Sequence, residues 1–259
     1  MTTTARPVRP PAPRVAGRAA AELVLVSVLF GIYTLGRALV DDGELVAFRN
    51  ARWVREVQDL LGLPSEAALQ AAVHALAHGE ALLRVGNVYY TGVHFPLMVV
   101  FLVWGFLRRP VAEYRWARNL VVLQTGAALV VHVAFPLAPP RMFPEWGFVD
   151  TMTRYGPSPY DGAGGALANQ LAAMPSLHVG WAVLIAYVVV RTGPRPLGVP
   201  AVGHAVLTTA IVVVTANHWW LDALAGVLLL VAAAAVLRRS GPGGTGSCGS
   251  GPVGAGVER

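Results

Sequence analysis

Residues 219–237 read WWLDALAGVLLLVAAAAVL, an apolar run with a single charged residue, Asp222, near its start. About 20 consecutive apolar residues are enough to cross the hydrocarbon core of a bilayer as a helix. Similar runs occupy Ala20–Val40, Val88–Leu107, Trp116–Phe135, Leu177–Val190 and Leu197–Thr215. The fourth run is short, but it is long enough to cross the hydrocarbon core when it is extended to Met174 and Arg191. The sequence therefore predicts an all-α integral membrane protein with six transmembrane helices.

The composition agrees with a membrane location. Hydrophobic residues make up 55% of the chain and charged residues only 13%, whereas a soluble domain carries roughly 25% charged residues. The net charge of +6 could suggest a nucleic-acid partner, but the Arg residues flank apolar segments, which the positive-inside rule explains better. The one cysteine, Cys248, excludes both a disulfide framework and a thiolate metal site.

Three regions are expected along the chain. Residues 1–18 are rich in Arg and Pro and predict a disordered cytoplasmic N-terminus. The apolar run that follows is longer than the core of a signal peptide, so it is interpreted as a retained first helix. Residues 19–240 would form the membrane catalytic domain, and the Gly-rich residues 241–259 a disordered tail.

The segment Glu44–Arg84, between the first and second apolar runs, is too polar for the membrane core. Its apolar residues recur at helical spacing with Arg and Glu between them: Phe48, Trp53, Val57, Leu60 and Leu61. This pattern predicts an interfacial helix that lies on the membrane surface or covers a site.

The positions of the arginines predict the orientation. With the N-terminus inside, twelve of the twenty basic residues lie in short cytoplasmic segments close to helix ends: Arg6, Arg9, Arg14, Arg18, Arg108, Arg109, Arg115, Arg118, Arg191, Arg195, Arg238 and Arg239. The opposite loops carry mixed charge. The positive-inside rule then predicts a multi-pass protein of the cell membrane with both termini in the cytoplasm.

Two short motifs carry reactive side chains. Met174-Pro175-Ser176-Leu177-His178 begins the fourth run, and Asn217-His218-Trp219-Trp220-Leu221-Asp222 begins the sixth. In the predicted topology both runs start at the outer face, so the two histidines should lie at the same depth. A third element, Pro139-Pro140-Arg141, lies in the long outer loop after the third run. All three can meet in one outer pocket.

The spacing of these residues suits chemistry on a phosphate ester. His218 and Asp222 are four residues apart and share a helix face, so the carboxylate can orient the imidazole for nucleophilic attack. A helix that starts at Ser176 offers unpaired N–H groups to a phosphate, and the serine adds a hydroxyl. Arg141 can supply a forked positive charge, and His178 can protonate a leaving oxygen.

Pro-Ser-x-His followed some forty residues later by His-x-x-x-Asp resembles the type 2 phosphatidic acid phosphatase superfamily, over roughly residues 85–230. Pro-Pro-Arg and the aromatic pair after His218 resemble its inositol-phosphorylceramide-synthase-like branch. The resemblance implies His218 as the nucleophile of a phospho-histidine intermediate, Asp222 as its orienting residue and His178 as the general acid. It also implies a lipid phosphate substrate, with neither metal nor cofactor.

The sequence departs from the family pattern at several positions. Leu177 replaces the usual Gly of Pro-Ser-Gly-His, and Ile211 and Val212 replace a Ser-Arg pair before the second histidine. Ala134 stands where a Lys is usual. Two phosphate-binding cations are therefore missing, which favours the synthase-like branch and leaves open whether water or a polar acceptor alcohol receives the phosphoryl group.

Other histidines leave alternatives open. Tyr90 and His94 share one face of the second run with Asn87 and are expected to line the substrate pocket, although an interhelical hydrogen bond explains His94 and His132 equally well. His204 is expected far from the site, with a structural role. Two other classes of function remain, a catalytically silent membrane scaffold of the same fold and a small transporter, although the sequence has no internal repeat of the transporter kind.

Overall fold

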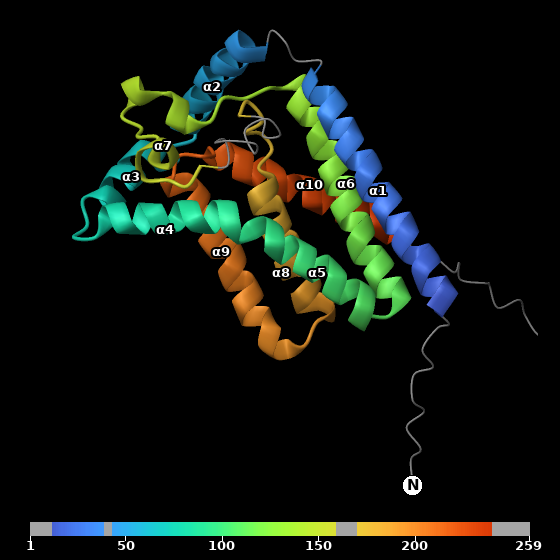
Figure 1. The fold of residues 1–259 in the computed structure, drawn as a ribbon. Coiled ribbons are helices and arrows are strands. Elements are labelled where there is room, and N and C mark those ends of the chain that lie inside the picture. Colours follow the sequence, from blue (N-terminus) through green and yellow to red (C-terminus); the bar gives the residue numbers. More distant parts are fainter. Residues whose placement is uncertain (1–11, 39–42, 159–169, 240–259) are drawn as a thin grey trace, which may run out of the picture.

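The computed structural model describes residues 12–38, 43–158 and 170–239, and every element in them is helical apart from one isolated bridge between Leu137 and Ala172. Residues 1–11 and 240–259, which hold most of the expected N-terminal region and the whole expected tail, lie outside this description. The first helix, α1 (Ala12–Ala38), begins inside the segment expected to be disordered and runs beside α6 (Val111–Ala134), as Figure 1 shows.

Four stretches are long and apolar enough to cross a membrane: Gly79–Arg108, Val111–Ala134, Arg195–Val214 and Trp220–Arg238. A shorter apolar helix, α8 (Leu177–Thr192), packs among them. Because large apolar side chains such as Val100, Val130 and Leu228 remain exposed on these helices, the bundle presents the surface that lipid tails would cover. The chain is thus an all-helical protein with four candidate spans among its described residues.

The second apolar run starts earlier than predicted. It consists of α4 (Gly79–Gly92) and α5 (His94–Arg108), which follow each other with a break at Val93. Pro96 explains the break, because its ring lacks an N–H and clashes with the carbonyl of the residue four positions earlier, Gly92. His94 lies near the middle of this longer apolar stretch, directly after the break.

The predicted interfacial segment is not one helix but two, α2 (Gly43–Leu60) and α3 (Glu66–His74). The side of α2 that packs against the protein carries small residues, Ala47, Ala51 and Val54, which allow close approach to the loop after α6. Trp53 and Leu60 are exposed. The face identified from large apolar residues is therefore largely the outward face, and α2 covers the loops that carry the candidate site.

The remaining helices surround α8. The pair α8 and α9 (Gly198–Val214) is joined by the short helix η4 (Arg195–Leu197), and α10 (Trp220–Arg239) crosses both α6 and α8. The loop between α6 and α8 contains η1 (Pro140–Met142), η2 (Pro144–Trp146) and α7 (Thr151–Tyr155).

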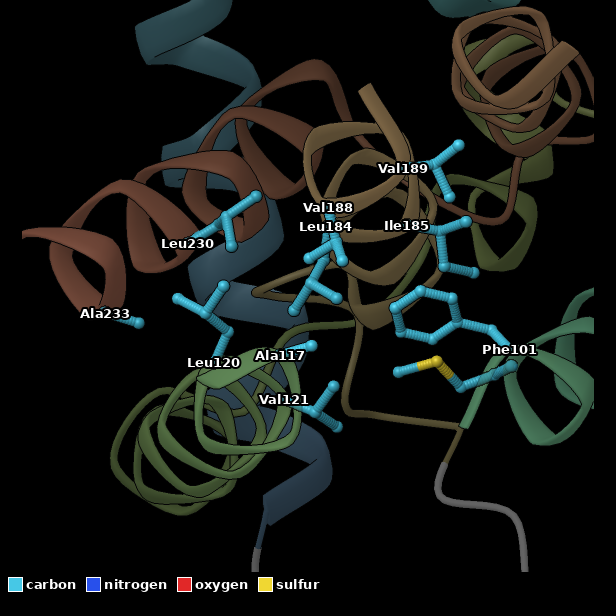
Figure 2. Close-up of a cluster of buried hydrophobic side chains, with 11 residues drawn as sticks. Phe101, Ala117, Leu120, Val121, Leu184, Ile185, Val188, Val189, Leu230 and Ala233 are labelled. Atoms are coloured by element: carbon cyan, nitrogen blue, oxygen red, sulfur yellow. The ribbon is translucent and has the colours of Figure 1, made fainter. Parts of the chain in front are cut away.

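Figure 2 shows how the bundle is held together. Leu120 from α6, Leu184 from α8, Phe101 from α5 and Leu230 from α10 meet in one cluster of buried side chains. Lipid tails are as apolar as leucine, so close packing and interhelical hydrogen bonds stabilise such a cluster more than removal from water does.

Candidate active site

The two predicted motifs meet because α8 and α10 cross at two glycines. A Cβ on Gly226 would lie 2.4 Å from the carbonyl oxygen of Ser176, and a Cβ on Gly180 would lie 3.3 Å from the carbonyl oxygen of Gly226. The backbone N–H of Ser176 donates to the carbonyl of Asp222 at 2.9 Å, and the Gln124 amide donates to the carbonyl of Gly226 at 2.9 Å. Gly226 leaves no room for a Cβ, and its close approach to Ser176 brings the N-terminal ends of both helices together.

His218 stands on a turn that the end of α9 holds in place. The carbonyl of Val212 accepts from the N–H groups of both Asn217 and His218, at 2.9 and 3.1 Å. Ala216 adopts a positive φ of 57° to make this turn, a conformation that non-glycine residues adopt only where the surroundings enforce it. The side chain of Asn217 adds a hydrogen bond to Thr215 Oγ1 at 2.8 Å. The position of His218 is therefore determined by its backbone before its side chain makes any contact.

The imidazole of His218 has a defined tautomer. Its Nδ1 lies 3.0 Å from the carbonyl oxygen of Ala173 and 3.3 Å from Oδ2 of Asp222. A carbonyl oxygen can only accept, so Nδ1 carries a hydrogen, and in the neutral imidazole the free electron pair is then on Nε2. Within the described part of the chain, Nε2 has no hydrogen-bond partner. This is the state that a nucleophilic histidine requires.

The Asp222 carboxylate has a second contact besides His218. The same oxygen, Oδ2, accepts from the backbone N–H of Trp219 at 2.8 Å, so the carboxylate also caps the first turn of α10. Asp222 is fully buried. Nδ1 of His218 therefore has two acceptors, this carboxylate and the nearer carbonyl of Ala173.

His178 lies in a stack of aromatic rings beside His218. The ring centroids of His178 and His218 are 5.8 Å apart. The ring of Tyr90 stacks on His178 at 4.0 Å, and His94 lies 4.6 Å from it on α5. Trp181 stacks on His94 at 5.8 Å. Tyr90, His94 and both motif histidines therefore gather in one place, as the sequence predicted.

His94 is buried, and neither of its ring nitrogens has a partner among the residues that the structure describes. The interhelical hydrogen bond considered as an alternative is not present in that part of the chain. His132 does make one, between its Nε2 and the carbonyl of Pro175 at 3.2 Å. His132 thus supports the turn that precedes Ser176, and His94 faces the stack.

Ser176 is the N-cap of α8, and its Oγ accepts from the N–H of Val179 at 3.3 Å. The hydroxyl hydrogen stays available for a donor role. The first backbone N–H groups of any helix have no partner within the helix, and at the start of α8 they lie next to His178. Such N–H groups and the positive end of a helix dipole favour an anion.

Arg141 reaches the site through its backbone. Its N–H donates to the carbonyl of Ala216, two residues before His218, at 2.9 Å. Its guanidinium contacts Oδ2 of Asp150 at 3.4 Å and Oε1 of Gln170 at 3.2 Å, and the side chain is almost entirely buried. These contacts hold the guanidinium on the loop that covers the site.

The expectation that His204 lies far from the site is wrong. Its Nδ1 is hydrogen-bonded to the hydroxyl of Tyr89, and its ring centroid lies 6.2 Å from that of His94. The contact arises because α4 packs against α9, which places Tyr89 beside His204.

Several residues of the site carried no usable motif. Gln124, fully buried in the middle of α6, could have been noticed as a polar residue inside an apolar run. Gly180 and Gly226 could not, because only the crossing shows that these glycines meet another backbone.

A family model described as the PAP2 superfamily matches residues 52–236, from α2 to α10. The chain belongs to the PAP2 superfamily. PAP2 proteins are typically metal-independent phosphatases, and membership suggests a lipid phosphatase or phosphotransferase that acts on phosphate esters. No curated protein and no solved structure matches the chain. Among the described residues no three His, Cys, Asp or Glu side chains form a group that could hold a metal ion.

Proposed function

We propose that this PAP2 protein transfers or hydrolyses the phosphate group of a membrane lipid through a phospho-histidine intermediate on His218. The observation that carries the proposal is the free Nε2 of His218, whose tautomer is set by Ala173 and which lies beside His178. Family membership supplies the reaction class, and the chain supplies a nucleophile, a second histidine and an anion site at one place.

The reaction has two steps. In the first, the Nε2 electron pair of His218 attacks phosphorus, the bond between phosphorus and the leaving oxygen breaks, and His178 gives its proton to the lipid alcohol. In the second, His178 removes a proton from water or from an acceptor alcohol, whose oxygen attacks the phospho-histidine and frees Nε2. Water yields inorganic phosphate, and an alcohol such as inositol yields a new phosphate ester.

Binding of the phosphate would use Ser176 and the start of α8, with Arg141, Tyr90 and His94 around it. His94 is buried beside His178, and its unpaired ring nitrogens are suited to phosphate oxygens. The Pro-Pro-Arg motif favours the inositol-phosphorylceramide-synthase-like branch, and therefore transfer over hydrolysis.

The proposed topology has six spans, with α1 and α8 added to the four long apolar stretches. Both termini would be cytoplasmic and the histidine site would open to the outer face. In a Cys248→Ser background, Ser158→Cys should react with an impermeant thiol reagent in intact cells, and Arg195→Cys should react only after the membrane is opened. The opposite pattern would overturn the orientation.

The reaction is tested with purified protein in detergent, without divalent metal. Lipid phosphates labelled with radioactive phosphorus, and labelled phosphatidylinositol, are offered to the wild type and to His218→Ala. His78→Ala is the matched control, because His78 is an exposed histidine outside the site. We expect acid-labile label on the wild type and on His78→Ala, followed by phosphate or a new lipid, and none on His218→Ala.

Equal behaviour of wild type and His218→Ala across the whole panel would contradict the phospho-histidine mechanism. If in addition no lipid phosphate raised the thermal midpoint of the wild type, a catalytically silent membrane protein would be favoured.

A further inference from the structure

The N-terminal turn of α10, which follows directly on His218, is held by side chains from two other helices. The backbone N–H of Trp220 donates to Oε1 of Glu66 at 3.1 Å, and that of Leu221 donates to Oε1 of Gln58 at 3.0 Å. The Gln58 amide also donates to Oε1 of Glu66 at 2.8 Å. Gln58 lies in α2 and Glu66 begins α3, so the two covering helices meet α10 at this point.

These contacts complete the hydrogen bonding of the first turn of α10. The first N–H groups of a helix have no intrahelical partner. Here the N–H of Trp219 is taken by Asp222, and those of Trp220 and Leu221 are taken by Glu66 and Gln58.

We infer that Gln58 and Glu66 are positioning residues for the proposed phosphoryl transfer, which hold the turn bearing His218 and Asp222 in the geometry the reaction needs. The inference rests on the proposed function. Both side chains are more than nine-tenths buried. Glu66 accepts from its own backbone N–H at the start of α3, where Ser65 accepts the cap bond. Apart from that local contact and the bond between the two side chains, both bind the backbone of α10.

A purely structural role predicts a different result from a positioning role. Displacing a reacting group by about 1 Å can lower a rate by roughly a hundredfold, whereas loss of a tether elsewhere lowers stability alone. Glu66→Ala removes the acceptor from Trp220, and Glu66→Gln keeps an oxygen at the same place. Ser65→Ala is the matched control, since it weakens the start of α3 and leaves the Glu66 contacts intact.

Two measurements are made on the full-length protein in detergent. The first is the single-turnover rate of label transfer to His218 from a labelled lipid phosphate. We expect Glu66→Ala to be slowed by roughly tenfold to a hundredfold with little change in KM, Gln58→Ala to be slowed less, Glu66→Gln to stay within about fivefold of the wild type, and Ser65→Ala to be unchanged.

The second measurement does not depend on activity. Hydrogen–deuterium exchange in the peptide that contains Trp220 and Leu221 should accelerate by roughly tenfold or more in Glu66→Ala and stay at the wild-type rate in Ser65→Ala. Unchanged exchange in Glu66→Ala would overturn the inference, and so would a normal transfer rate in that variant while His218→Ala is inactive. A wild type that traps no label, combined with accelerated exchange in Glu66→Ala, would overturn the proposed function. The role of Gln58 and Glu66 in positioning His218 for catalysis would then be overturned with it.

Discussion

The crossing of α8 and α10 offers a decisive perturbation, the substitution Gly226→Ala. The new methyl group would lie 2.4 Å from the Ser176 carbonyl oxygen, and real Cβ atoms stay at least 3.0 Å from such atoms. The atoms that the methyl group would meet belong to the backbone of Ser176 and Gly180 and cannot rotate away, so the two helices must separate by about 0.6 Å. The 2.9 Å bond from Ser176 N–H to the Asp222 carbonyl then lengthens toward 3.5 Å, the limit of a hydrogen bond.

The energetic effect follows from two contributions. Overpacking a close contact costs about 1–3 kcal/mol, and the weakened hydrogen bond adds about 1 kcal/mol. A loss of about 2–4 kcal/mol corresponds to a fall in Tm of roughly 5–15 °C for a chain of this size. The same shift moves Ser176 and His178 relative to His218, so the turnover rate should fall by roughly tenfold or more.

The assay compares Gly226→Ala with Gly126→Ala, a glycine of the neighbouring helix α6 whose added Cβ would meet nothing within 4 Å. Thermal unfolding in detergent and turnover of a labelled lipid phosphate are measured for both variants. Gly126→Ala should keep the wild-type rate and gain up to about 1 kcal/mol of stability. If Gly226→Ala matched Gly126→Ala in both measurements, the close crossing would not be what holds the two motifs together.

Three further changes test other parts of the site. Tyr90→Phe keeps the ring that stacks on His178 at 4.0 Å and should retain the rate within a few-fold, whereas Tyr90→Leu loses about 0.5–1.5 kcal/mol of stacking and should lower kcat. Arg141→Lys cannot reproduce the forked contacts with Asp150 and Gln170 and should raise KM for the lipid phosphate by roughly tenfold, so an unchanged KM would argue against its role. Burial, reinforced by the nearby Asp222 carboxylate, raises the pKa of Glu66 above its ordinary value of 4.5, so its contribution to stability is present at acid pH and is lost as the pH rises through the folded-state pKa. The Tm of the wild type relative to Glu66→Gln should therefore fall as the pH rises above the ordinary Glu value of 4.5, and a constant difference would contradict this reasoning.

The electrostatic surroundings of Glu66 make the pH test specific. The Asp222 carboxylate of α10 acts electrostatically on Glu66. Glu66 also lines a small cavity of about 40 Å³ together with the Arg55 and Asp59 side chains of α2. A cavity of that size has room for water, so Glu66 can exchange its proton with solvent although it is buried. Glu66→Gln removes the titrating group and leaves the others in place.

Much of the architecture could be predicted from the sequence alone. The apolar runs identify candidate membrane helices for two reasons. A bilayer requires about 20 apolar residues to be crossed, and its core offers no hydrogen-bond partner to the backbone N–H and C=O groups, which must pair within a helix. The motifs around His178 and His218 were recognisable because reactive side chains at helix starts are rare inside apolar sequence. Their meeting could also be expected, since the orientation of the runs puts both helix starts on one side.

What the sequence could not determine depends on contacts between distant residues. Nothing in the local pattern distinguishes Gly226, which meets the Ser176 carbonyl, from Gly126, which meets nothing. The partner of His218 Nδ1 is a backbone carbonyl, that of Ala173, and every residue carries such a group. Glu66 and Gln58 resemble any polar residues of a surface helix until the first turn of α10 is seen to donate to them. Composition and periodicity decide which segments enter the membrane, because lipid acts on each segment separately, whereas the geometry of the histidine site arises only where separate segments approach within hydrogen-bond distance.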